Sequence, residues 1–196
     1  MFYTILDCPP LPVEFEKEVI ATVRGTERLK VKTFKDAPGR KEYRERLVTM
    51  PDGSQCISVT SQKWSISAEL EQWIRDNVYD GPWVDVGINS HNTVSNVMGP
   101  HVDDIKNEII LYVVETGGDN VETAWWQEQG FPVERPDKLP ANNNGEFYTS
   151  SDDYRQLNEL KRVCLPTGKW VRMNTLVLHS VENITGRRTI VKIGLE

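Results

Sequence analysis

Short β-type runs separated by turn residues occupy the second half of this 196-residue chain. Seven segments are expected to form strands, at residues 83–89, 105–115, 121–127, 162–165, 169–173, 175–181 and 188–195. Glycine, asparagine and proline punctuate these runs, as is typical of antiparallel sandwiches and barrels. Because no helical segments alternate with the runs, the pattern predicts a mainly β fold rather than a parallel α/β fold.

Two helical segments precede these strands. Residues 12–25 carry apolar side chains at helical spacing and end at Gly25, a plausible stop. Ser67 is a suitable N-cap for a second helix that continues to about residue 77. We therefore expect helices that flank the β region.

The chain is expected to form a single domain over residues 1–196. In this interpretation, residues 1–82 support a barrel that is built from residues 83–196. A polar, proline-containing insertion at about 128–158 interrupts the strands. Together with residues 30–63, this insertion is the expected specificity element, because loops over a rigid scaffold usually select the substrate.

Composition narrows the classes of partner. The net charge is −6 and no cluster of Lys and Arg forms a phosphate footprint, which disfavours nucleic-acid binding. No apolar run approaches the ~20 residues of a membrane span. The three cysteines are dispersed and the N-terminus lacks a secretory pattern, so we expect reduced thiols and a cytoplasmic location. The oligomeric state stays open.

The sequence His101-Val102-Asp103, with His179 far downstream, is the strongest candidate for chemistry. A His and an Asp two residues apart on an extended strand point to the same side, so both can bind one ion. A second His from a distant strand would complete two imidazoles and one carboxylate, the facial triad of non-haem iron oxygenases. The alternative is a pair of solvated strand-end residues and a hydrogen-bonded core histidine.

Two arginines open the final strand, and an inward-facing one could bind a carboxylate through a bidentate, charge-assisted contact. Strand alternation lets only one of Arg187 and Arg188 face inward. If Arg188 faces inward, Lys192 does too, which is awkward for a core. If Arg187 does, Val191 and Ile193 follow it and make a better apolar face. The residues alone leave this choice open.

The combined pattern resembles the iron(II)- and 2-oxoglutarate-dependent oxygenase superfamily. Within it, the sequence pattern is most similar to the prolyl-hydroxylase-like branch. The resemblance spans roughly residues 83–195 and is carried by the segments 99–103, 110–113, 117–118, 168–171, 179–183 and 186–188. Members of this superfamily typically have an Arg or Lys about nine or ten residues after the second metal-binding His. That spacing selects Arg188.

The resemblance implies a double-stranded β-helix, a jelly-roll or cupin-like barrel, in which His101, Asp103 and His179 bind Fe(II). Arg188 would hold the distal carboxylate of the co-substrate 2-oxoglutarate, and dioxygen would be the oxidant. No catalytic residues are expected beyond the metal ligands. The expected reaction is hydroxylation of a C–H bond, on a peptidyl or amino-acid side chain or another small molecule.

Further site residues follow from the resemblance. Tyr112 is the nearest candidate for a tyrosine that contacts 2-oxoglutarate, and Asn89 and His91 stand in a segment with the same role in some relatives. His91 departs from the family pattern, which has tyrosine there. Of the adjacent Trp125 and Trp126, one is expected to pack in the core and the other to border the substrate.

Two other functions remain open at this stage. One is a cupin-like metalloenzyme that does not use 2-oxoglutarate, and an Arg188 facing solvent would favour it. The other is a non-catalytic binding module on the same barrel, and failure to bind any metal would favour that one.

Overall fold

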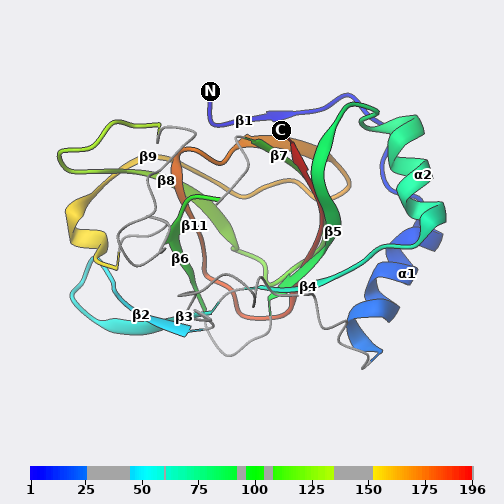
Figure 1. The fold of residues 1–196 in the computed structure, drawn as a ribbon. Helices are drawn as coiled ribbons and strands as arrows, with labels where there is room; N and C mark the ends of the chain where they lie inside the picture. The colour runs from blue at the N-terminus through cyan, green and yellow to red at the C-terminus, as the bar shows by residue number, and fades with distance from the viewer. Residues whose placement is uncertain (26–44, 60, 92–95, 104–107, 135–151, 196) are drawn as a thin grey trace, which may run out of the picture.

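The computed structural model describes residues 1–25, 45–59, 61–91, 96–103, 108–134 and 152–195 (Figure 1). The larger sheet contains, in order, β1 (Tyr3–Ile5), β10 (Trp170–Asn174), β7 (Glu108–Thr116), β12 (Arg188–Leu195), β5 (Trp83–His91) and β4 (Gln62–Trp64). The smaller sheet contains β6 (Met98–His101), β11 (Leu178–Glu182), β8 (Glu122–Glu128) and β9 (Leu157–Val163). A separate hairpin is formed by β2 (Glu45–Thr49) and β3 (Gln55–Val59).

The order of the strands is that of a double-stranded β-helix. From β5 to β12 the chain passes from one sheet to the other at each step except β8 to β9, which both belong to the smaller sheet. The pairings within the two sheets are all antiparallel. This topology is a jelly roll, so the expected mainly β class is confirmed.

The two helices cover the outer face of the larger sheet, beside β5 in Figure 1. They are α1 (Val13–Arg24) and α2 (Ala68–Asn77). Ser67 caps α2, because its hydroxyl accepts a hydrogen bond from the Leu70 N–H at 3.1 Å, as expected. Val19, Leu70 and Ile74 pack against the sheet, where burying each side chain contributes about 1.5–3 kcal/mol. No helix in the described ranges has the length and apolar character needed to cross a bilayer.

Different residues of the same strands line the interior between the sheets. An apolar cluster there draws on both sheets and includes Ile109, Leu111 and Val113 of β7, Trp125 of β8 and Val171 of β10. A second cluster lies on the outer face of the smaller sheet. The hairpin β2–β3 and the short 3-10 helix η1 (Tyr154–Gln156) cover it through Val48 and Tyr154.

After residue 83, β6 and β9 are the strands that differ most from the expectation. β6 was not expected because it contains Gly99-Pro100, yet it lies at the edge of the smaller sheet, where proline is tolerated. β9 covers Leu157–Val163 instead of 162–165. Its pairing with β8 shifts register between Trp125 and Trp126, and such a bulge breaks the alternation that sequence reasoning relies on.

A tight turn after β7 sets the start of β12. Gly117 has φ +85°, and its carbonyl accepts hydrogen bonds from the N–H groups of Thr185 and Gly186. A Cβ at Gly117 would lie 2.8 Å from the Cβ of Arg188 and 3.3 Å from Ile184 Cγ2. The turn therefore packs directly against the backbone that carries Arg188.

We expect Gly117→Ala to lower the free energy of unfolding by about 2–5 kcal/mol. About 1–2 kcal/mol comes from the left-handed backbone and about 1–3 kcal/mol from the clash. Gly130→Ala is the matched control, because Gly130 has φ +83° and nothing within 4 Å of the added Cβ. Urea unfolding should show a loss of only about 1–2 kcal/mol for the control. Equal losses in the two variants would contradict the proposed contact with Arg188.

Candidate metal centre

The pairing of β6 with β11 brings two histidines together. His101 and His179 are register partners across these strands, and their ring centroids lie 4.4 Å apart. His179 is buried in the middle of the sheet, whereas His101 ends the edge strand and is partly exposed. Residues distant in sequence therefore share one point on the inner face of the smaller sheet.

Asp103 joins the histidines from just beyond β6. The intervening Val102 packs in the cluster on the outer face, so His101 and Asp103 point together to the inner side. The Asp103 N–H donates to the carbonyl of Thr175 at 3.3 Å, which fixes the backbone. Asp103 Oδ1 lies 3.8 Å from His101 Nε2, and one ligand atom from each of the three residues lies within 4.8 Å of the others.

Backbone carbonyls set the proton positions on both imidazoles. His101 Nδ1 lies 2.9 Å from the carbonyl oxygen of Gly99, and His179 Nδ1 lies 3.0 Å from that of Val177. A carbonyl oxygen can only accept, so each Nδ1 carries the proton and donates. Each neutral ring then presents the Nε2 lone pair, and the same arrangement orients histidines in metal sites.

Burial also favours the neutral form of His179. Desolvation lowers the pKa of this imidazole below its usual value, and this effect outweighs the opposing one from Asp103. A neutral imidazole is the form that binds a cation. The two nitrogens and one carboxylate are therefore a donor set that could hold a metal ion.

Lys192 completes the surroundings of Asp103. Its Nζ lies 3.3 Å from Asp103 Oδ2, and the two side chains are 10% and 16% exposed. The concern that an inward lysine is awkward is thus resolved, because the buried ammonium pairs with a carboxylate. Sequence reasoning identified Lys192 as inward only conditionally and assigned it no function; its four-residue spacing from Arg188 was the available signal.

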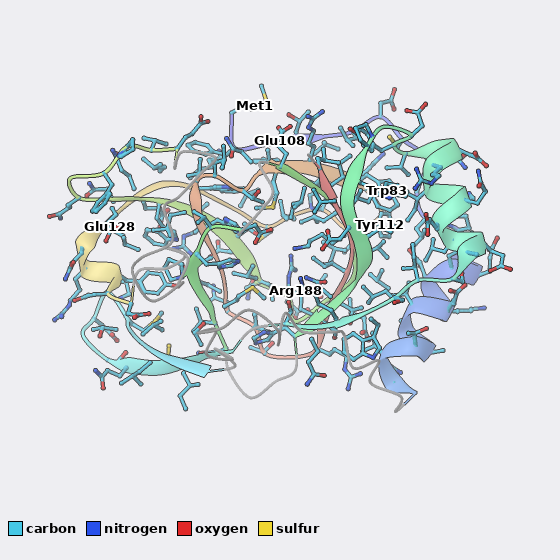
Figure 2. All side chains as sticks on the ribbon, viewed as in Figure 1. Met1, Trp83, Glu108, Tyr112, Glu128 and Arg188 are labelled. Atoms are coloured by element: carbon cyan, nitrogen blue, oxygen red, sulfur yellow. The ribbon has the colours of Figure 1, made fainter. Side chains whose placement is uncertain are left out.

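Arg188 lies on the same face of β12 as Lys192. Val191 and Ile193 pack with the helices, whereas Ile190 packs in the interior cluster, and alternation puts Arg188 on the side of Ile190. The Arg188 side chain is buried and Arg187 is partly exposed. Figure 2 labels Arg188 at the lower end of this strand.

The Arg188 guanidinium is short of partners. Its Nη1 donates to the carbonyl of Thr116 at 3.2 Å, and among the residues that the structure describes no carboxylate pairs with it. Desolvation lowers the pKa of Arg188 to about 10, so it remains a cation at neutral pH. A buried guanidinium with donors to spare is suited to binding an anion.

Asn89 and His91 lie on β5 beside this arginine. His91 is the register partner of Arg188, and Asn89 is the partner of Ile190, so both share the interior-facing side. His91 is 1% exposed, and the Asn89 side-chain amide donates to Ser61 Oγ at 3.4 Å. The structure therefore brings these two residues to the arginine rather than to the metal ligands.

Tyr112 does not reach the cluster, which corrects the expectation for this residue. It lies between the larger sheet and the helices (Figure 2), where its hydroxyl donates to Glu16 at 2.8 Å. Burial, and then the interaction with Glu16, raise the pKa of Tyr112 to about 12. The reason is alternation: Leu111 and Val113 face the interior, so Tyr112 faces outward.

The two adjacent tryptophans face opposite sides of β8. Trp125 is the register partner of His179, is fully buried, and stacks on Tyr3 with centroids 5.6 Å apart. Its indole N–H has no hydrogen-bond partner within the described part of the chain. Trp126 packs in the outer cluster and donates to Ser180 at 2.9 Å, so it does not border the interior.

The expected specificity elements lie largely beyond the described residues. Residues 135–151 of the insertion at 128–158 lie outside the described residues. Residues 30–44 and 60 of the segment 30–63 also lie outside them. The described residues at the start of the insertion at 128–158 include Glu134, which forms a β-bridge with Val177, the residue before β11. The two ends of the insertion join β8 to β9.

Comparison with known proteins gives no family. No family model matches the chain, and no curated protein matches its sequence. Among solved structures, AviO1 from Streptomyces viridochromogenes Tue57 is 11% identical over 98% of this chain and 89% of that chain, with a TM-score of 0.44. EvdMO1 is 9% identical over 98% of this chain and 47% of its own length (TM-score 0.44), and E. coli ycfD is 14% identical over 100% and 55% (TM-score 0.34). These TM-scores are low, so the fold is assigned from the strand order of this chain alone.

We expect His101→Ala and His179→Ala each to weaken Mn(II) binding more than about 100-fold, since removing even a residue that supports a ligand typically costs 10–100-fold. The affinity is measured by the electron paramagnetic resonance signal of free Mn(II). His91→Ala is the matched control, because His91 is, like His179, a buried imidazole and lies outside the cluster. Loss of affinity in the control, or full affinity in either ligand variant, would exclude this cluster as the metal site.

Proposed function

We propose that this chain is an iron(II)- and 2-oxoglutarate-dependent dioxygenase that hydroxylates a C–H bond. The observation that carries the proposal is the Arg188 guanidinium, which is buried, has no carboxylate partner among the described residues, and lies on the interior-facing side of the strand that also carries Lys192. This guanidinium would bind the second carboxylate of a co-substrate such as 2-oxoglutarate. A site that bound only a metal ion would not need a buried arginine.

The donor set supports iron in preference to a structural zinc ion. Two Nε2 lone pairs and one carboxylate oxygen converge from one side, and both imidazoles are oriented by backbone carbonyls. Structural zinc sites usually have four protein ligands, often thiolates. The nearby Lys192 ammonium has no lone pair while it is protonated, so it is not a fourth ligand. Three ligands therefore remain among the described residues.

His101, Asp103 and His179 would hold the ion on one face and leave the opposite positions accessible. When bound together, ferrous iron, 2-oxoglutarate and dioxygen supply the oxidation: the 2-oxo acid is decarboxylated to succinate, and one oxygen atom enters a C–H bond of the substrate. The protein contributes ligands, orientation and exclusion of water.

Arg188 would orient the co-substrate by a bidentate hydrogen bond to its distal carboxylate. Its low exposure strengthens such a contact, because water competes less in a buried site. His91, the register partner of Arg188, would line the same end of the interior, with Asn89 two residues away on the same face. Between the two ends, the 2-oxo acid would span from the metal to the guanidinium.

The substrate is proposed to be a peptidyl or amino-acid side chain, on the strength of the prolyl-hydroxylase-like sequence pattern. Among the described residues, Trp125 is the candidate for contact with it, because it faces the interior, is the register partner of His179, and has an indole N–H with no described hydrogen-bond partner. The specificity elements would be the insertion at 128–158 and the segment 30–63. A cytoplasmic location and the absence of a nucleic-acid partner belong to the same proposal.

The proposal is tested by anaerobic titration of the Fe(II)-loaded protein with 2-oxoglutarate, followed by the weak visible charge-transfer band of the chelate. We expect Arg188→Gln to weaken binding roughly 10- to 150-fold for each hydrogen bond lost, because each charge-assisted hydrogen bond contributes about 1.5–3 kcal/mol. Arg187→Gln is the matched control and should bind like the wild type, since Arg187 is partly exposed.

A shorter 2-oxo acid makes this test specific. 2-Oxobutyrate lacks the distal carboxylate, so its weaker binding should be the same in the wild type and in Arg188→Gln. A band that forms equally well in both proteins with 2-oxoglutarate would remove Arg188 from the proposal. Bound iron with no band would favour a metalloenzyme that does not use 2-oxoglutarate, and failure to bind iron would favour a binding module.

A further inference from the structure

We propose that Lys192 is a positioning residue of the metal centre, which holds one oxygen of Asp103 so that the aspartate binds the metal through the other oxygen alone. The inference rests on the proposed function only in requiring that the His101, Asp103 and His179 cluster binds a divalent metal. It adds a reason why a lysine lies in the interior of the barrel.

The two oxygens of Asp103 have different neighbours. Oδ1 lies 3.8 Å from His101 Nε2, on the side where the ligand atoms converge, whereas Oδ2 lies 3.3 Å from Lys192 Nζ. A carboxylate that binds a metal through both oxygens would have to turn Oδ2 away from the ammonium. The arrangement of the two oxygens therefore suits binding through Oδ1 alone.

The position of Lys192 is set by its strand. β12 is hydrogen-bonded on both sides, with Lys192 opposite Gly87 of β5 and Leu111 of β7. The Lys192 residue is 8% exposed. A buried ammonium needs charged or hydrogen-bonding partners, and Asp103 Oδ2 at 3.3 Å is one of them. Lys192 can therefore hold Oδ2 firmly.

One-oxygen binding has a chemical consequence. With two imidazoles and a single carboxylate oxygen, an octahedral ion keeps three positions open, which a 2-oxo acid and dioxygen would fill. A carboxylate bound through both oxygens would occupy one of those positions. By holding Oδ2, Lys192 would keep that position open, at some cost in metal affinity because a cation would lie next to the metal.

The test uses Mn(II) bound to the whole chain and counts exchangeable inner-sphere waters by water-proton relaxation and by broadening of the Mn(II) resonance in oxygen-17 water. We expect about three waters in the wild type and about two in Lys192→Met, where the ammonium no longer holds Oδ2 and this oxygen can turn to the metal. Mn(II) affinity should rise severalfold in this variant, since a neighbouring positive charge is removed. Lys192→Arg, which retains a cation, should keep about three waters.

Lys161→Met is the matched control, because Lys161 is exposed on β9 and carries the same charge. It should keep both the wild-type water count and the wild-type affinity. An unchanged count in folded Lys192→Met would overturn the role of Lys192. Two waters in the wild type would overturn it without any variant, because Asp103 would then already bind through both oxygens. Absence of Mn(II) binding by the wild type would instead refute the metal centre itself, and with it this inference.

Discussion

The pairing of the edge strand β6 with β11 is the contact on which the site depends. It makes His101 the register partner of His179, and it turns Asp103 to the same side because Val102 is held in the outer apolar cluster. A one-residue slip of β6 would reverse which side chains face inward and would dissolve the cluster. The hairpin β2–β3 and η1, which cover the outer face of this sheet, therefore support the candidate metal centre from behind through packing.

The part of the site that the larger sheet contributes depends on the alternation of side chains along β12. Val191 and Ile193 bury themselves against the helices, and this fixes Arg188 and Lys192 on the interior side of the larger sheet. The two cations then have different environments: Lys192 pairs with Asp103, while Arg188 has no described carboxylate partner. One cation thus neighbours the candidate metal ligands, and the other is the candidate anchor for an anionic co-substrate.

Sequence reasoning could identify the two helices, the mainly β class and the three metal-ligand candidates, because caps, periodicity and His-x-Asp spacing are local signals. The jelly-roll topology was implied by the family resemblance and not by these signals. It could not settle the direction of Arg188, since an inward Lys192 looked unfavourable until Asp103 was known to lie beside it. Tyr112 was assigned to the wrong face because a register cannot be read from a continuous apolar run such as that of β7. The edge strand β6 was hidden by its proline.

The most direct test of the central proposal is an anaerobic crystal structure with Mn(II) and 2-oxoglutarate bound. We expect the ion on His101, Asp103 and His179, with the distal carboxylate within hydrogen-bonding distance of the Arg188 guanidinium. An ion bound elsewhere, or a distal carboxylate that contacts Lys192 or solvent instead of Arg188, would contradict the proposal.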